Sequence, residues 1–185
     1  MNLSAVDLDM KILGAILAGG RSRRFGQDKA EVVIDGIAML DHVIASLSIQ
    51  VDGLVICGRD WKNMTRVEDR PTADMGPLGG LNGAMAYARE QKFDAVVTVP
   101  VDVLPLPANL IELLSGQEAA VFAEQHLIGF WPVSLSETLD IYMTSTNGGA
   151  FRGWLEHVAV KTIKEPLRLH NVNSPDDLTA FLHRE

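Results

Sequence analysis

An apolar stretch that stops abruptly at a glycine-rich, basic loop sets the strongest limit on how this chain can fold. Residues 11–17 read KILGAIL, an apolar run broken only by Gly14, and residues 17–30 continue as LAGGRSRRFGQDKA. A continuous apolar run of this length is typical of a strand that is buried on both faces of a parallel sheet. The sequence therefore predicts a buried strand that delivers the loop to one edge of the sheet.

Further strand and helix patterns alternate along the chain. Apolar residues recur at helical spacing over residues 39–49, whereas residues 54–57 form a short apolar run between glycines. We expect strands at 11–17, 54–57, 95–99, 119–123 and 127–133, and helices at 39–49, 81–90, 110–114 and from Ser174 onward, where Ser-Pro-Asp-Asp is a strong helix start. This alternation predicts an α/β fold with helices on both faces of a mostly parallel sheet, and with ligands at the carboxyl ends of the strands.

Length and composition fit one domain. The chain has 185 residues, of which 47% are hydrophobic, and it contains no repeat or linker, so we expect a single domain over 1–185 with residues 1–10 as a flexible N-terminus. Cys57 is the only cysteine, which excludes an intrachain disulfide. Because no cleavable apolar stretch and no run near the ~18 residues that span a bilayer is present, we expect a cytoplasmic protein without a membrane partner.

The charge is unevenly distributed. The formal net charge is −8, yet segment 21–29 carries Arg21, Arg23, Arg24 and Lys29 against Asp28 and is net +3, which leaves −11 for the remaining chain. Proteins that bind nucleic acid spread basic residues over a face. One short cationic segment in an acidic chain instead favours a small anion, such as a phosphate chain, and no nucleic-acid partner.

The loop has the composition of a phosphate-binding loop. Glycines after a buried strand let backbone N–H groups approach an anion, and Arg and Lys neutralise its charge. The Walker pattern and the dinucleotide-binding fingerprint both require other glycine and lysine spacings. The alternative is a flexible surface turn with solvated arginines.

Several motifs resemble one family. LAGGRSRRFGQDKA resembles the L-A-G-G-x-S-x-R-M-G-x-D-K signature of the molybdenum cofactor guanylyltransferases, the MobA-like nucleotidyltransferases, with Phe25 in place of the usual methionine. Further matches follow in family order: Glu68-Asp69, GPLGG at 76–80, Asp102 in VPVD, GFWP at 129–132, and NVNSPDDL with Asn171 and Asn173. The resemblance covers almost the whole chain, and it implies a single-domain, three-layer α/β/α Rossmann-like nucleotidyltransferase fold.

The resemblance also implies roles for single residues. Lys29, Arg24 and Asp102 are the implied catalytic residues, with Lys29 and Arg24 on the triphosphate, where they would stabilise developing charge. The implied nucleotide-binding residues are Leu17, Ala18, Gly19, Gly20, Lys29, Cys57, Asp69, Gly79 and Asp102. As a residue at a strand end, Asp102 could equally cap the next turn or hold Mg²⁺; the resemblance favours a magnesium ligand.

Asp69 and Cys57 both belong to the implied nucleotide side. Asp69 could accept hydrogen bonds from guanine N1–H and N2–H₂, or it could be an ordinary loop acid. Cys57 stands where the family often has an asparagine. Because a lone strand cysteine is usually an inert buried hydrophobe, we expect Cys57 to lie near the base only through its backbone.

The acceptor side resembles the family less closely. Asn171 and Asn173 are two apart in an expected extended segment and so share a face; they are either a polar turn before a helix or, as the resemblance implies, contacts to the pterin acceptor. The proline after Asp102 is displaced by one position, and no proline follows His126. His126 by itself is more typical of a structural histidine, and Trp131 and Trp154 of core or rim aromatics.

The function implied by the resemblance is Mg²⁺-dependent transfer of GMP from GTP to the terminal phosphate of molybdopterin or molybdenum cofactor, with release of pyrophosphate. Other cofactor-biosynthesis proteins and acceptor molybdoenzymes are further implied partners. Two alternatives remain open: a related cytidylyl- or sugar-phosphate nucleotidyltransferase, and a GTP-binding module without transfer activity.

Overall fold

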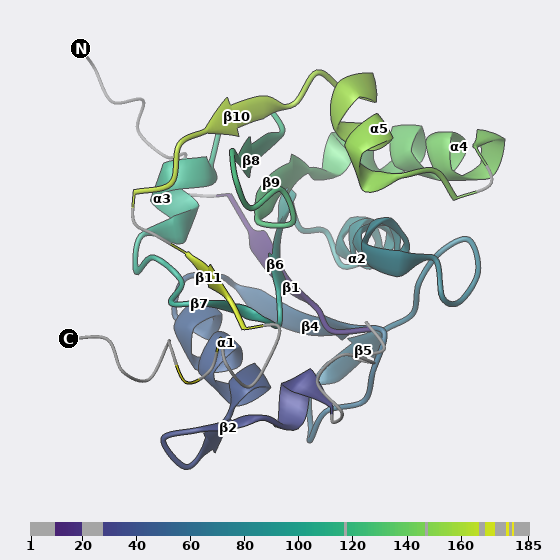
Figure 1. The fold of residues 1–185 in the computed structure, drawn as a ribbon. Coiled ribbons are helices and arrows are strands. Elements are labelled where there is room, and N and C mark those ends of the chain that lie inside the picture. The colour runs from purple at the N-terminus through teal and green to yellow at the C-terminus, as the bar shows by residue number, and fades with distance from the viewer. Residues whose placement is uncertain are drawn as a thin grey trace.

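A mostly parallel, seven-stranded sheet runs through the centre of the molecule (Figure 1). The computed structural model describes residues 10–19, 28–116, 118–146, 148–166, 169–172, 177 and 179. The strand order is β10-β8-β9-β6-β1-β4-β5. The strands are β1 (Ile12–Leu17), β4 (Gly53–Cys57), β5 (Thr65–Val67), β6 (Ala95–Pro100), β8 (Ala120–Phe122), β9 (Gly129–Pro132) and β10 (Lys161–Ile163).

The predicted strands β1, β4 and β6 form parallel pairs at the centre of the sheet. β1 pairs in parallel with both β4 and β6, β4 pairs in parallel with β5, and β8 pairs in parallel with β10. β9 runs antiparallel to β6 and β8 and joins the two groups of parallel strands. Every residue of β1 and β6 is buried, as expected for strands covered on both faces. The predicted α/β architecture is therefore confirmed.

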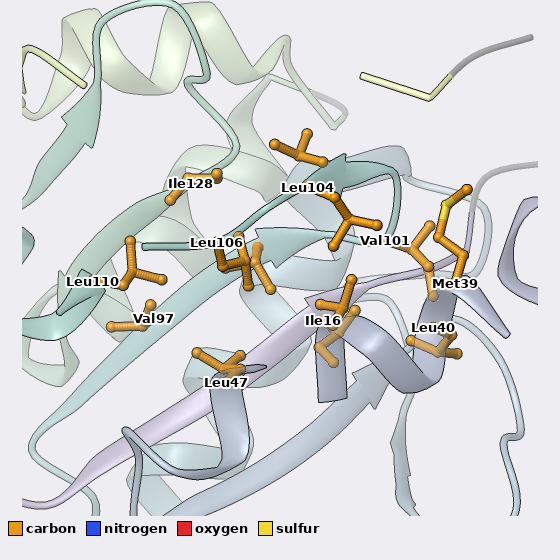
Figure 2. Packing of buried hydrophobic residues seen from close by; sticks show 14 of the residues in the cluster. Ile16, Met39, Leu40, Leu47, Val97, Val101, Leu104, Leu106, Leu110 and Ile128 are labelled. Atoms are coloured by element: carbon orange, nitrogen blue, oxygen red, sulfur yellow. The ribbon is translucent and has the colours of Figure 1, made fainter. Parts of the chain in front are cut away.

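Helices cover both faces of this sheet. α1 (Met39–Ser48) and α3 (Leu110–Leu114) pack into one core cluster, and α2 (Gly76–Glu90), α4 (Ser136–Ser145) and α5 (Phe151–His157) pack into another. Figure 2 shows part of the first cluster, with Ile16 of β1 near Met39 and Leu40 of α1. Alternate residues of β1 enter the two clusters, so the strand contributes apolar side chains to both layers.

Two small sheets flank the main one. β2 (Val33–Ile34) and β3 (Ile37–Ala38) form a hairpin whose turn holds Asp35 and Gly36 at positive φ. β7 (Val103–Leu104) pairs antiparallel with β11 (His170–Asn171). The second pair places the chain near its C-terminal end beside the segment that follows β6.

The structure corrects one helix boundary. We expected a helix from Leu81, but α2 starts at Gly76 and so includes the whole GPLGG segment. Pro77 lies at the start, where its missing N–H is not needed. Glycines allow this turn to pack closely, since a Cβ on Gly79 would lie 2.4 Å from Met75 Cβ and one on Gly80 would lie 3.1 Å from Leu17 Cδ2. A pattern of glycines that reads as a loop is here the packing surface of a helix.

Other elements carry too weak a pattern to be predicted. β5, α4, α5 and β10 have no counterpart among our expectations, and α4 buries only Ser136, Leu139 and Met143. The predicted helix start at Ser174, Pro175 and Asp176 lies outside the described residues. Within the part of the chain that the structure describes, no helix is both long and apolar enough to span a membrane.

Candidate active site

The carboxyl ends of β1, β4 and β6 meet at one edge of the sheet. In the register of the strands, Leu17 lies opposite both Cys57 and Pro100. The Ala18 N–H donates to the Cys57 carbonyl at 3.1 Å, and the Val101 N–H donates to the Leu17 carbonyl at 3.3 Å. The first residues of the glycine loop therefore lie beside the ends of both neighbouring strands, which is where open α/β sheets bind ligands.

Lys29 and Asp102 meet at this edge. The Lys29 Nζ lies 2.7 Å from Asp102 Oδ2, and the two side chains are 15% and 21% exposed. Lys29 begins a 3₁₀ helix (Lys29–Glu31), and Asp102 lies just beyond β6. The structure thus brings together two of the three predicted catalytic residues; Arg24, the third, lies outside the described residues.

The donor set around Asp102 fits a magnesium ion bound together with substrate. Among the residues that the structure describes, no group of three or more His, Cys, Asp or Glu could hold a metal ion by itself. Mg²⁺ is usually held by one or two carboxylates, with water and substrate phosphates as the other ligands. A single, partly exposed carboxylate beside a phosphate-loop candidate meets that requirement.

The start of the glycine loop touches the end of β4 through backbone atoms. A Cβ on Gly58 would lie 2.6 Å from the Gly19 Cα and 3.1 Å from the Gly19 nitrogen, and Gly58 has a φ of +81°. Both space and backbone conformation therefore require glycine at this position. Gly20, the next predicted nucleotide-binding residue, lies outside the described residues.

We predict that Gly58→Ala destabilises the protein by about 2 kcal/mol or more and weakens GTP binding, because positive φ strain is added to a clash with Gly19. Gly36→Ala is a matched control, since Gly36 has the same φ of +81° and nothing within 4 Å of an added Cβ. Chemical denaturation and GTP titration of both variants measure the two effects. Equal losses of stability and intact GTP binding in both variants would contradict the steric role of Gly58.

The Asp69 side chain lies against the residue that precedes α2. Its Oδ2 accepts a hydrogen bond from the Met75 N–H at 3.0 Å. Burial raises the pKa of Asp69, the Met75 N–H opposes that rise, and the carboxylates of Asp74 and Glu68 add to it. A Cβ on Gly79 would lie 3.1 Å from the Asp69 Cβ, so two predicted nucleotide-binding residues are neighbours.

Gly80 links this group to the sheet edge. A Cβ on Gly80 would lie 3.1 Å from Leu17 Cδ2, 3.2 Å from Cys57 Cβ and 3.7 Å from Asp69 Oδ1. Leu17, Cys57 and Asp69, which come from three separate segments, therefore lie around the turn of α2 that carries Gly79 and Gly80.

Cys57 is an inert thiol in this setting. Its side chain is buried, and burial, followed by the nearby charge of Asp69, raises the pKa of Cys57 to about 12. The thiol stays protonated at neutral pH and is a poor nucleophile. In the described part of the glycine loop, the Ala18 N–H donates to the backbone carbonyl of Cys57.

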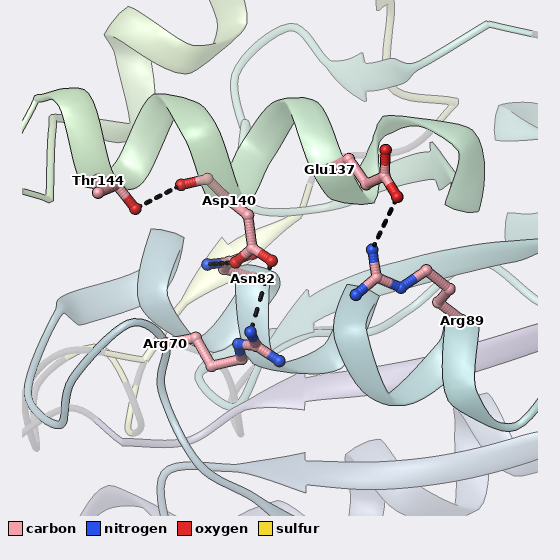
Figure 3. Close-up of polar contacts among 6 residues, drawn as sticks. All are labelled: Arg70, Asn82, Arg89, Glu137, Asp140 and Thr144. Atoms are coloured by element: carbon pink, nitrogen blue, oxygen red, sulfur yellow. Dashed lines mark hydrogen bonds and ion pairs between the residues drawn. The ribbon is translucent and has the colours of Figure 1, made fainter.

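A polar contact fastens the start of α2 to α4. Figure 3 shows Asp140 of α4 accepting from Asn82 at 2.9 Å and from Arg70 at 3.4 Å. Arg70 directly follows Asp69, and the Arg70 N–H donates to the Gly79 carbonyl at 3.1 Å. The segment that carries Asp69 is thus bound to α4 through the Arg70 side chain and to α2 through the Arg70 backbone.

Asn171 pairs with the residue that directly follows Asp102. It is opposite Val103 in the β7–β11 pair and is exposed, and the neighbouring Val172 N–H donates to the Asp102 carbonyl at 2.8 Å. Asn173, the other predicted acceptor residue, lies outside the described residues. The exposed Asn171 is therefore at the same edge as the Lys29–Asp102 pair.

Trp131 and Trp154 belong to the core. Trp131 and Trp154 are fully buried, and the Trp131 Nε1–H donates to Thr98 Oγ1 at 3.0 Å. Neither is available to stack on a ligand. His126 lies exposed in the turn between β8 and β9.

Sequence reasoning missed a charged pair next to the site. Arg59 Nη1 donates to Asp28 Oδ1 at 2.7 Å, and Nη2 donates to Asp28 Oδ2. The hydrogen bond from Arg59 lowers the pKa of Asp28, partly offset by burial. The available signal was the position of Arg59 directly after Gly58, the glycine that follows β4.

Comparisons with known proteins find related sequences and folds. Residues 14–160 match the MobA-like NTP transferase domain. A relative from Rhizobium leguminosarum bv. trifolii, named molybdenum cofactor guanylyltransferase, is 32% identical over 188 residues, covering 91% of this chain and 90% of the relative.

Two solved structures show the same fold. The molybdopterin-guanine dinucleotide biosynthesis protein A from Archaeoglobus fulgidus has a TM-score of 0.70 and 20% identity, covering 91% of this chain and 95% of that chain. A putative glucose-1-phosphate thymidylyltransferase from Bacillus anthracis has a TM-score of 0.71 and 12% identity, covering 92% of this chain and 94% of that chain. Since the family match spans most of the chain, the protein belongs to the MobA-like NTP transferase domain family.

Proposed function

We propose that this chain transfers GMP from GTP to the terminal phosphate of molybdopterin, or of the molybdenum cofactor, and releases pyrophosphate. The observation that carries the proposal is the Lys29–Asp102 pair at the carboxyl ends of β1 and β6. The 32% identity to a molybdenum cofactor guanylyltransferase supports the choice of nucleotide and acceptor.

The proposed step joins an oxygen of the acceptor phosphate to the α-phosphorus of GTP. The bond from that phosphorus to the oxygen bridging the α- and β-phosphates breaks, and this oxygen leaves on pyrophosphate. A phosphate oxygen is already anionic at neutral pH, so the nucleophile needs no protein base. Catalysis then consists of alignment and stabilisation of charge.

Lys29 and Asp102 have complementary parts in this step. The Lys29 ammonium would stabilise the charge that develops on the phosphoryl oxygens. Asp102 would hold Mg²⁺, which when bound neutralises and aligns the phosphates. Because the ammonium and the carboxylate are in contact, they can act on the same triphosphate. Arg24 is proposed as a further triphosphate contact.

The remaining predicted residues divide between the two substrates. Leu17, Ala18, Gly19, Gly20, Cys57, Asp69 and Gly79 are proposed to form the nucleotide side, with Asp69 on the guanine edge. Asn171 and Asn173 are proposed to contact the pterin, since amide groups suit its donor and acceptor edge. The exposure of Asn171 near Asp102 supports that placement.

We predict that GTP with Mg²⁺ raises the melting temperature more than ATP, CTP or UTP does, and that pyrophosphate release with molybdopterin requires GTP. A site that hydrogen-bonds one base leaves its own polar groups unpaired with another, so discrimination is strong. The test combines thermal shift with a pyrophosphate assay and detection of the guanine dinucleotide product.

The other outcomes identify the alternatives. A preference for CTP or UTP would indicate a different nucleotidyltransferase, in keeping with a fold shared by a thymidylyltransferase. Strong GTP stabilisation without pyrophosphate release would indicate a binding module that lacks transfer activity.

A further inference from the structure

We propose that Arg59 is a positioning residue for the transfer: it fixes the position of Lys29 by binding both carboxylate oxygens of Asp28. The proposal rests on the proposed function for its kinetic consequence. Its structural part stands on contacts among Arg59, Asp28, Lys29 and Asp102.

Asp28 binds Arg59 through its side chain and directly precedes Lys29 in the chain. Both of its carboxylate oxygens accept from the Arg59 guanidinium, and Oδ1 also accepts from the Ala30 N–H at 3.0 Å. Asp28 is the N-cap of the 3₁₀ helix that begins with Lys29. Fixing the Asp28 side chain therefore fixes the backbone from which Lys29 extends to Asp102.

The sheet anchors Arg59. It follows Gly58, whose N–H donates to the Val67 carbonyl at 3.0 Å and so extends the pairing of β4 with β5. The Arg59 side chain is only 20% exposed. A planar guanidinium that binds both oxygens of a carboxylate holds it in one orientation, which a single ammonium cannot do. The orientation of Asp28 is thus set by a rigid strand end.

Arg59 also affects which carboxylate the Lys29 ammonium pairs with. Lys29 is next in sequence to Asp28 and could pair with that carboxylate. Arg59 occupies both oxygens of Asp28, and the Lys29 Nζ lies against Asp102. Two ion pairs result: Arg59 with Asp28, and Lys29 with Asp102.

The kinetic test uses Arg59→Met and Arg59→Lys. We expect Arg59→Met to lower kcat about 10- to 10²-fold, because a small misplacement of a reacting group has an effect of that size, and to change the KM for GTP less than about 3-fold. Arg59→Lys keeps the charge but loses the two-pronged contact, so its kcat should be intermediate. Arg89→Met is the control, since Arg89 contacts Glu137 at 3.5 Å between α2 and α4, as Figure 3 shows.

A double-variant comparison tests whether Arg59 acts through Lys29. If it does, Arg59→Met should add no further loss of kcat to Lys29→Ala. If the kcat losses of Arg59→Met and Lys29→Ala multiply in the double variant, the proposal is overturned. A change in the KM for GTP of Arg59→Met as large as its change in kcat would also overturn it.

A chemical readout on the substrate-free protein needs no enzymatic activity. The rate at which an amine-reactive ester modifies Lys29 is measured by peptide mass spectrometry, with Lys62, which is 64% exposed, as internal reference. We expect several-fold faster modification of Lys29 in Arg59→Met and Arg59→Lys, and no change in Arg89→Met. Unchanged modification of Lys29 would overturn the positioning role, whereas faster modification in a protein that transfers no GMP would overturn only the proposed function.

Discussion

Replacing Asp102 with asparagine is expected to reduce Mg²⁺-dependent transfer by about 10³-fold, because Asp102 would hold Mg²⁺ and the charge of the bound ion would supply several kcal/mol of transition-state stabilisation. Asparagine keeps the shape of the side chain and loses its charge. The fold should survive, since the contact that Asp102 makes with the β7–β11 pair uses its backbone carbonyl, which accepts from Val172. Initial rates over a range of Mg²⁺ concentrations, together with the melting temperature, measure both expectations.

Asp41→Asn is a matched control for this experiment. Asp41 is 23% exposed and lies 2.6 Å from Lys62 Nζ, whereas Asp102 is 21% exposed and lies 2.7 Å from Lys29 Nζ. Both variants neutralise a similarly exposed aspartate that pairs with a lysine, but Asp41 belongs to α1 and its partner Lys62 is 64% exposed, whereas Lys29 is 15% exposed. Near-normal transfer by Asp102→Asn at saturating Mg²⁺ would mean that another carboxylate holds the metal.

The central strands could be predicted from the sequence because burial on both faces leaves a continuous apolar run. Residues 11–17, 54–57 and 95–99 each show such a run, and β1, β4 and β6 lie there. Since parallel strands end at the same edge, these runs also place the glycine loop near Asp102. In the structure, Lys29 and Asp102 lie 2.7 Å apart at this edge.

The pairing of Arg59 with Asp28 could not be predicted in this way. The two residues are 31 positions apart and belong to a strand end and a loop. Neither has a sequence period, and their contact depends on how the turn after β4 lies against the segment before the 3₁₀ helix. Long-range contacts between single polar side chains leave no repeating pattern along the chain.

The GPLGG segment shows a different reason for an incomplete prediction. Glycine weakens helices intrinsically, so the segment favours a loop by propensity. In the structure, Gly79, Gly80 and Gly83 lie in α2, where a Cβ would lie 3.1 Å from Asp69 Cβ, 3.2 Å from Cys57 Cβ and 2.0 Å from the Glu68 carbonyl oxygen, respectively. Tertiary packing therefore overrides the local preference at the point where α2 contacts the proposed nucleotide side.

Lys29→Ala is expected to lower kcat by about 10² to 10³-fold, the usual effect of removing one preorganised electrostatic contact to a transition state. GTP affinity should fall less than kcat, because the charge on the phosphoryl oxygens increases only as the reaction proceeds. Saturation kinetics separate these effects: equal losses in kcat and kcat/KM indicate a contact made only in the transition state.

Lys62→Ala controls for the loss of a lysine from an ion pair with an aspartate, since Lys62 pairs with Asp41. It should leave both constants unchanged. The Lys29 side chain has a second effect that the experiment also reveals. When Lys29 is removed, Asp102 loses the cation at 2.7 Å, so its carboxylate attracts Mg²⁺ more strongly. The Mg²⁺ concentration for half-maximal rate should therefore fall even as kcat drops. A collapse of GTP affinity with unchanged kcat at saturation would instead make Lys29 a contact that binds substrate and transition state equally.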